Sequence, residues 1–171
     1  MISDLSIIGC GQIGSKLAFK LSKKRIISSL KIYDFDKITT YSEKNEYENN
    51  LFKVDVVEFE CKKVHPDLSI SVYHTKVVDP VKSGFVVDCR DNKKTSLNSN
   101  LRVSIDGYVL YLDSLKKYIS SNYFLYTLPK NEIYTDRAID IIIDYLYNDL
   151  FYFNDMRLYN LETAELFTWR N

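Results

Sequence analysis

Gly9-Cys10-Gly11-Gln12-Ile13-Gly14 lies between a short apolar run, residues 5–8, and a segment with helical spacing of apolar residues, 12–24. Such a G-x-G-x-x-G loop between a strand and a helix suits phosphate binding. Its first glycine allows a tight turn, its second lets a phosphate approach the backbone, and its third lets the helix pack on the strand. Free amides and the dipole at the helix start also attract anions. We therefore expect nucleotide contacts from Gly9, Gly11, Gln12, Ile13 and Gly14.

An acidic residue follows the next apolar run at the spacing that this loop requires. Residues 30–33 read as a second strand, and Asp34 follows them about 20 residues after the loop, where a ribose-hydroxyl acceptor is expected. Asp36 closes the same turn and is a further candidate contact to the nucleotide. The alternative is a scaffold that keeps the tight turn and binds nothing.

The remaining pattern alternates between strands and helices. It predicts an α/β fold: a Rossmann-like, mostly parallel sheet with helices on both faces. Residues 39–50 are polar and aperiodic, as in a loop, and residues 118–128 fit one or two antiparallel strands. The other expected helices cover 51–64, 92–103 and 138–150, and the other expected strands cover 68–73, 84–89 and 108–112.

Length and composition predict one domain with an ordinary core. The 171 residues form a single expected domain, 1–171, with a core over 1–113 and a segment over 114–171 that closes the fold or binds a partner. Lysines plus arginines number 23, as do the acidic residues, so the net charge is zero. That balance argues against nucleic acid or an anionic membrane as a partner.

The chain has three cysteines, Cys10, Cys61 and Cys89, with no paired spacing. An odd, sparse set indicates a reducing compartment, so we expect a cytoplasmic protein, in the host cytoplasm or the virion if the source is viral. We expect all three to be small packed residues rather than nucleophiles.

Several further motifs follow the glycine loop in a fixed order along the chain. Asp34-Phe35-Asp36 closes the second strand, and Lys53 lies on a helix that precedes His65-Pro66-Asp67. The run Val86-Val87-Asp88-Cys89-Arg90-Asp91-Asn92 then follows a strand. Over residues 5–113 this order resembles the ThiF/MoeB/E1-like (ubiquitin-activating enzyme-like) adenylating family, and its D-C-x-D-N is more specific than the glycine loop alone.

The resemblance implies an activity and a set of roles. In such enzymes ATP adenylates the C-terminal carboxylate of a ubiquitin-like protein or a peptide, and the domain commonly forms a homodimer. Asp34 would accept the ribose hydroxyls, Lys53 would contact the triphosphate, and Asp91 would hold Mg²⁺. Lys53 and Asp91 are thus the catalytic candidates.

The chain also departs from the family pattern. Where the family carries S-N-L-x-R-Q, Ser42 and Asn45 stand at the asparagine and arginine positions, with Lys44 as a substitute cation, and Ser96 replaces an arginine after D-N. No cysteine follows Cys89, so a thioester step is not expected. Two alternatives therefore stay open: a non-catalytic binding or structural subunit of a larger assembly, and an NAD(P)-binding oxidoreductase domain.

Overall fold

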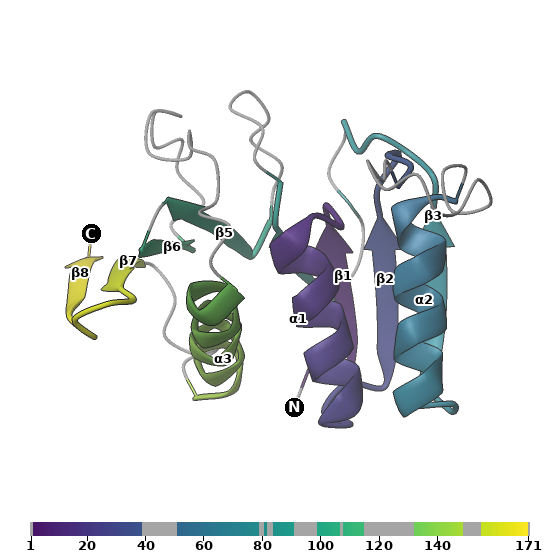
Figure 1. Cartoon of the computed structure of the whole chain (residues 1–171), viewed down its shortest axis with the longest axis horizontal. Helices are drawn as coiled ribbons and strands as arrows, with labels where there is room; N and C mark the ends of the chain where they lie inside the picture. The colour runs from purple at the N-terminus through teal and green to yellow at the C-terminus, as the bar shows by residue number, and fades with distance from the viewer. Residues whose placement is uncertain are drawn as a thin grey trace.

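The computed structural model describes residues 2–38, 51–78, 81, 84–90, 99–106, 108–114, 132–148 and 155–170. In this part of the chain the strands form one eight-stranded sheet in the order β3-β2-β1-β4-β5-β6-β7-β8, with the C-terminal strands at one edge (Figure 1). The strands are β1 (Asp4–Ile8), β2 (Ser29–Tyr33), β3 (Ser69–Tyr73), β4 (Phe85–Asp88), β5 (Leu101–Asp106), β6 (Val109–Asp113), β7 (Asp155–Asn160) and β8 (Leu166–Arg170).

The N-terminal half of the sheet is parallel, and the C-terminal half is antiparallel. Strands β3, β2, β1, β4 and β5 pair in parallel, whereas β5 to β8 form antiparallel neighbours. The central strand β1 is buried on both faces, since Leu5, Ser6 and Ile7 have no exposed surface. A run without alternation is what a doubly covered parallel strand requires. In β2, by contrast, only Leu30 and Ile32 are fully buried.

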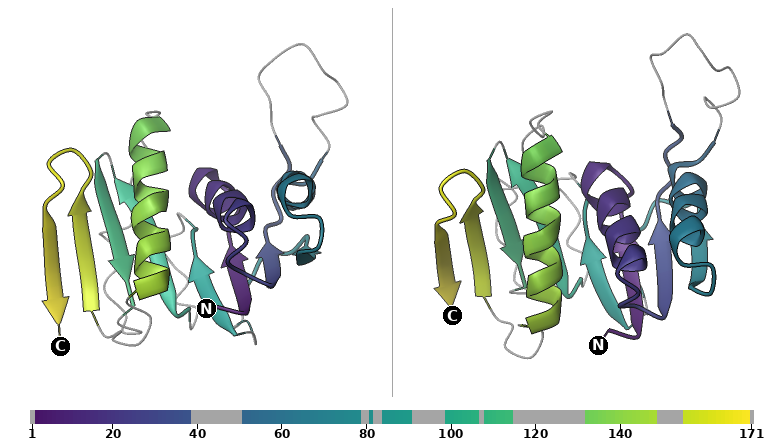
Figure 2. Two further views of the ribbon diagram at one scale, coloured as in Figure 1. Left: turned by 90° about the horizontal axis from the view of Figure 1, so that it is seen from below. Right: turned by 60° about the horizontal axis from the view of Figure 1, so that its bottom comes forward.

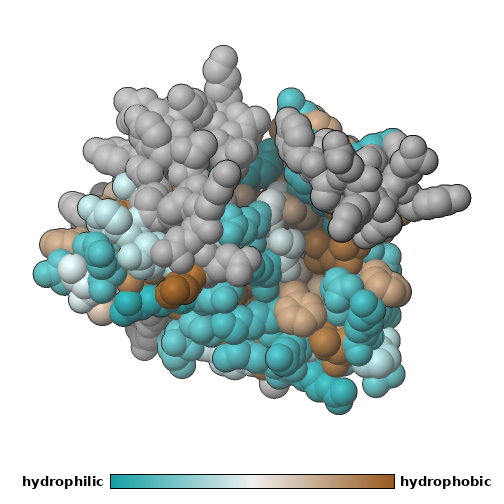
Figure 3. Space-filling view, viewed as in Figure 1, coloured by the Kyte–Doolittle hydropathy of each residue, from teal (hydrophilic) through white to brown (hydrophobic). Residues whose placement is uncertain are grey.

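Three helices are described: α1 (Gln12–Lys23), α2 (Lys53–Val64) and α3 (Glu132–Asn148). They lie side by side on one face of the sheet (Figures 1 and 2), with α1 between α2 and α3. Each buries residues at helical spacing, such as Leu17 and Leu21 in α1, and Ile139 and Ile143 in α3. The outer face of the helical layer, which points away from the sheet, is mainly hydrophilic where it is coloured in Figure 3.

Polar contacts also join α1 to α3. Gln12 Nε2 donates to Thr135 Oγ1 at 3.2 Å, Lys16 Nζ pairs with Asp136 at 3.0 Å, and Lys20 Nζ pairs with Asp140 at 2.7 Å. The two ion pairs lie at the surface, where such pairs typically contribute less than about 1 kcal/mol. The buried apolar side chains therefore carry most of the helix packing.

The predicted α/β fold class is confirmed, with corrections in detail. The described helices share one face, and residues 92–98, where a further helix is expected, lie outside the described residues. Residues 101–103, expected at the end of that helix, belong to β5, because Leu101, Val103 and Ile105 alternate and bury one strand face. The expected helix over 138–150 begins earlier, at Glu132, and ends at Asn148.

The segment after Asp113 contributes more sheet than its sequence pattern indicates. Strands β7 and β8 extend the sheet beyond β6 through antiparallel pairing. The expected strands over 118–128 and the expected loop over 39–50 lie outside the described residues. Within the described chain, every helix is too short or too polar to cross a membrane.

Candidate functional site

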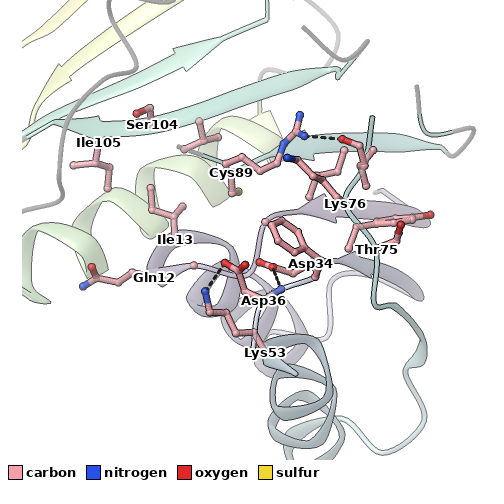
Figure 4. Close-up of a pocket in the computed structure, with 18 residues that line it drawn as sticks. Gln12, Ile13, Asp34, Asp36, Lys53, Thr75, Lys76, Cys89, Ser104 and Ile105 are labelled. Carbon is pink, nitrogen blue, oxygen red and sulfur yellow. Dashed lines mark hydrogen bonds and ion pairs between the residues drawn. The ribbon is translucent and has the colours of Figure 1, made fainter. Parts of the chain in front are cut away.

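A pocket of about 500 Å³ opens at the carboxyl ends of β1, β2, β3 and β4 (Figure 4). This is the edge at which open parallel sheets bind ligands. Its volume lies within the range of roughly 300–1,000 Å³ that is typical of small-molecule sites. The residues that line it are Ile8, Gly9, Gly11, Gln12, Ile13, Tyr33, Asp34, Phe35, Asp36, Lys53, Thr75, Lys76, Val77, Cys89, Arg90, Val103, Ser104 and Ile105.

The glycine loop forms the floor of the pocket at the start of α1. Gly9 has φ +91°, which favours glycine, and its N–H donates to the Tyr33 carbonyl at 2.8 Å. A Cβ on Gly14 would lie 1.9 Å from the Gly9 carbonyl oxygen, so only glycine lets α1 pack against the loop there. A Cβ on Gly11 would have no heavy atom within 4 Å. Gly11 therefore faces open space beside the amides of the first turn of α1, which have no intrahelical acceptors.

Asp34 is held rigidly by backbone donors. Its Oδ2 accepts the Cys10 N–H at 2.6 Å, and its Oδ1 accepts the Asp36 N–H at 2.8 Å. Each oxygen of a carboxylate can accept about two hydrogen bonds. One acceptor site thus remains on each oxygen, oriented by the loop and the β2 end together, which suits a ribose with two hydroxyls.

Lys53 and Asp36 form an ion pair at the pocket wall. Lys53 is the first residue of α2, and its Nζ lies 2.9 Å from Asp36 Oδ2. The Lys53 N–H also donates to the Asp36 carbonyl, at 3.0 Å. The lysine and aspartate side chains are 31% and 47% exposed, so solvent reaches both and either can turn to a new partner.

A second ion pair is buried in the pocket wall, where Arg90 is one of the lining residues. Arg90 donates from Nε and Nη2 to the two oxygens of Asp88, at 2.9 and 2.8 Å, and from Nη1 to the Val77 carbonyl at 2.9 Å. Its side chain is 15% exposed and that of Asp88 only 3%. Such a planar, bidentate pair is strong and directional. It fixes the segment after β3 to the end of β4.

Two cysteines lie buried at this end of the sheet, in surroundings that disfavour the thiolate. Burial, followed by the charge of Asp34, raises the pKa of the Cys10 thiol far above its ordinary range. Burial and the nearby Asp88 likewise raise the pKa of Cys89. Cys61, inside α2, is fully buried too, and burial raises its pKa. All three are packed thiols, as predicted.

The structure brings most of the predicted site residues together. Those that line the pocket are Gly9, Gly11, Gln12, Ile13, Asp34, Asp36 and Lys53. Gly14 is not a lining residue and instead lets α1 approach the loop. Asp91, the predicted Mg²⁺ ligand, lies outside the described residues. The ligand roles of these residues stay predictions.

Sequence reasoning missed part of the pocket. Thr75, Lys76 and Val77 follow β3, and Arg90 follows β4, at the same sheet edge as the glycine loop. The general rule that ligands bind at the carboxyl ends of parallel strands points to such positions. It does not say which side chains there face the ligand.

Comparison with solved structures identifies the fold. The chain is similar to E. coli MccB with ATP at TM-score 0.69, covering 97% of this chain and 62% of MccB at 12% sequence identity. The MccB structure with succinimide matches at TM-score 0.72 and covers 97% of this chain and 62% of MccB, at 12% identity. The MccB structure with AMPCPP and selenomethionine MccA matches at TM-score 0.71 and covers 97% of this chain and 63% of MccB, also at 12% identity. No protein-family profile and no curated protein matches the sequence.

The structural similarity to MccB shows that the chain has a Rossmann-type fold. MccB is a ThiF/MoeB-like adenylating enzyme, and the chain has the Rossmann-type fold expected from its resemblance to that family. It spans less than two thirds of the length of MccB.

Proposed function

We propose that this chain binds ATP in the pocket at the carboxyl ends of β1, β2, β3 and β4. We propose further that it adenylates the C-terminal carboxylate of a peptide or a ubiquitin-like protein. One observation carries the proposal: Gly11 faces open space in the same pocket that Asp34 and Lys53 line. The fold shared with MccB, whose solved structures include ATP and AMPCPP complexes, supports a nucleotide with a phosphate chain.

ATP fits the donors and acceptors of this pocket. The phosphate chain would lie over Gly11 and meet the free amides and positive dipole at the start of α1. The ribose hydroxyls would donate to the free acceptor sites of Asp34, whose orientation is fixed by the Cys10 and Asp36 amides. Lys53 would turn from Asp36 toward the phosphates as a compact point charge.

The proposed reaction is a phosphoryl substitution that needs little covalent help from the protein. An oxygen of the substrate carboxylate attacks the α-phosphorus of ATP. The bond from that phosphorus to the bridging oxygen of the β-phosphate breaks, and pyrophosphate leaves with the electron pair. The product is a mixed anhydride of the acyl group and AMP. Positioning and neutralisation of phosphate charge carry most catalysis of this kind, and in the described chain these are the tasks of the loop amides and Lys53.

The alternative of a non-catalytic binding subunit has its own supporting observation. The side chains of Lys53 and Arg90 are both paired with carboxylates, so neither presents uncompensated charge to a ligand. A protein that kept the fold without the chemistry would have no need to free Lys53. Binding and turnover must therefore be measured separately. The oxidoreductase alternative predicts NAD(H) binding.

Ligand binding is tested first, by thermal unfolding with ATP, AMP, adenosine or NAD(H). ATP at 100 times its Kd should add about 2.7 kcal/mol of stability, which raises Tm by roughly 5–10 °C for a domain of this size. No shift with ATP refutes the proposal, and a shift with NAD(H) alone favours the oxidoreductase alternative.

Catalysis is tested by exchange of labelled pyrophosphate into ATP in the presence of peptides that end in Gly-Gly. Lys53→Ala should reduce exchange by about 100-fold, the order seen when one group that stabilises transition-state charge is lost. Lys63→Ala, on the far end of α2 and outside the pocket, is the matched control and should keep wild-type exchange. ATP binding without exchange would support the non-catalytic alternative.

A further inference from the structure

The segment after β3 crosses the carboxyl ends of the neighbouring strands and forms one wall of the pocket. Thr75, Lys76 and Val77 all line it, although β3 itself is the edge strand. In Figure 4, Lys76 lies across the pocket from Lys53, with Asp34 and Asp36 between them. Lys76 is thus a second lysine at the site, drawn from a part of the chain that contains no recognised motif.

The backbone of this wall makes a local turn before Lys76 and is anchored to β4 through Arg90 after it. The Thr75 N–H donates to the Tyr73 carbonyl at 2.9 Å. The Val77 side chain is buried against Ile8 and Val86, and the Val77 carbonyl accepts from Arg90 Nη1. Since Asp88 holds Arg90 in a buried bidentate pair, Arg90 is a positioning residue for the wall. The Lys76 side chain is exposed, but its attachment point is fixed.

The same arginine places the wall beside the glycine loop. A Cβ on Gly9 would lie 2.8 Å from Arg90 Cγ, so the stem of Arg90 packs directly on the loop. The head of Arg90 holds the carbonyl of the residue next to Lys76. The Lys76 amine therefore extends from a wall that adjoins the loop proposed to bind phosphate.

Charge balance in the pocket points to what this amine binds. Among the described lining residues, Lys53 is paired with Asp36, and Arg90 is paired with Asp88. Lys76 has no carboxylate partner there. Its Nζ lies 5.7 Å from the centre of the Phe35 ring, and Phe35 is half exposed. The third carboxylate of the pocket, Asp34, accepts two backbone N–H groups and forms no ion pair with Lys76. A cation–π contact at an exposed site is weak, so an anionic ligand can recruit the Lys76 amine.

We propose that Lys76 is a specificity-determining residue that binds the phosphate chain of the nucleotide and so selects nucleoside polyphosphates over nucleosides. This inference rests on the proposed ATP binding and assigns its phosphate recognition to a residue outside the known motifs. Lys76 rests on Phe35 in the free protein and moves to the phosphates when the nucleotide binds. Arg90 keeps the wall in place throughout.

The test compares the dissociation constants of ATP and adenosine, measured by calorimetry at two salt concentrations. Lys76→Met should raise the Kd of ATP about tenfold, the value of one charge-assisted contact near the surface, and leave the Kd of adenosine unchanged. The dependence of ATP binding on salt should also become shallower, because one screened charge pair is lost. Lys76→Arg should bind ATP nearly as the wild type does.

Lys63→Met is the control, because the Lys63 amine also lies over a phenylalanine ring, 4.3 Å from the centre of Phe59, but outside the pocket. Unlike Lys76, Lys63 also pairs with a carboxylate, that of Glu60, at 2.7 Å. It should leave both dissociation constants unchanged. If the wild type binds ATP and Lys76→Met binds it equally well, the role of Lys76 is wrong and the proposed function stands. An equal loss of ATP and adenosine binding would mean a general role in the pocket and would also overturn the inference. A wild type that binds no ATP overturns both proposals.

Discussion

Two glycines of the same loop predict opposite outcomes for the same substitution by alanine. A Cβ on Gly14 would lie 1.9 Å from the Gly9 carbonyl oxygen and 3.0 Å from the Gly9 carbonyl carbon. A Cβ on Gly11 would have nothing within 4 Å, and its φ of −69° and ψ of −165° are open to alanine. Gly14→Ala should therefore damage the fold, whereas Gly11→Ala should damage only ligand binding.

The size of the first effect follows from the contact at Gly14. Helix α1 and the loop must separate by more than about 1 Å before the new Cβ and the Gly9 oxygen are 3.0 Å apart. The oxygen belongs to the backbone and cannot rotate away as a side chain would. Overpacking of this kind costs typically 1–3 kcal/mol, and we expect about 3 kcal/mol here, which lowers Tm by roughly 6–12 °C for a chain of this length.

The second effect is confined to the pocket. Gly11 is the N-cap of α1, and replacing glycine by alanine there costs less than about 1 kcal/mol of stability. The added methyl group, however, projects into the space over the loop that we assign to the phosphate chain. We expect Gly11→Ala to unfold within a few degrees of the wild type and to bind ATP at least tenfold more weakly.

Both variants are measured by circular dichroism during heating and by ATP titration at a temperature where all forms are folded. Two results would contradict these expectations. A Gly14→Ala protein as stable as the wild type would mean that the packing of α1 on the loop is wrong. A Gly11→Ala protein with unchanged affinity for ATP would mean that the phosphate does not lie over this glycine.

Two further predictions concern charge and burial. Asp36→Asn frees Lys53 and removes a negative charge from the pocket. Titration should therefore show several-fold tighter ATP binding, and the free energy of unfolding should fall by less than about 1 kcal/mol. Weaker ATP binding would contradict the proposed role of Lys53. The three buried cysteines should resist alkylation in the folded protein and react on unfolding, as followed by mass spectrometry. Because burial raises the pKa of Cys61 in the fold, its contribution to stability is complete below about pH 8.5 and falls as the pH rises toward the folded pKa. Cys61→Ala should flatten this decline, and an unchanged slope would argue against it.

The parts of the fold that the sequence predicts well are those with local signals. Strand β1, the glycine loop and α1 follow one another with a change from an apolar run to helical spacing, and the observed bounds, Asp4–Ile8 and Gln12–Lys23, differ from the expected ones by one residue. Pro66 marks the end of α2 just as directly. Each signal lies within the segment that it determines or directly beside it, so no tertiary contact is needed to interpret it.

The segment around Leu101 shows why other parts could not be predicted. Leu97 and Leu101 are four residues apart, as on a helix face, whereas Leu101, Val103 and Ile105 alternate, as on a strand. The structure follows the second pattern, because β5 pairs with both β4 and β6 and buries all three alternating side chains. The parallel partner β4 lies 13 positions earlier in the chain, from Asp88 to Leu101, so a local window over residues 97–105 does not contain it and weighs both patterns equally.

The same distinction applies to the candidate site. Gly11, Asp34 and Lys53 carry signals in short motifs and were predicted. Lys76 lies in no motif, and Arg90 occupies the unspecified position of D-C-x-D-N, so neither side chain was assigned to the pocket. Both reach it through the crossing of the chain from β3 at the edge to β4 near the centre. Their proximity depends on strand order, which sequence spacing does not encode.

The exposure of the two ion pairs limits how the pocket can respond to a phosphate chain. The Arg90–Asp88 pair is buried, and removing either partner from such a pair typically costs about 3–5 kcal/mol, so it stays closed. The Lys53–Asp36 pair is partly exposed and contributes less than about 1 kcal/mol, which the attraction of a triphosphate exceeds. Arg90 is therefore a fixed part of the wall, and Lys53 is the cation that can change partners. Loss of pyrophosphate exchange in Lys53→Ala, with ATP binding retained, would therefore show that this change of partner serves catalysis as well as binding.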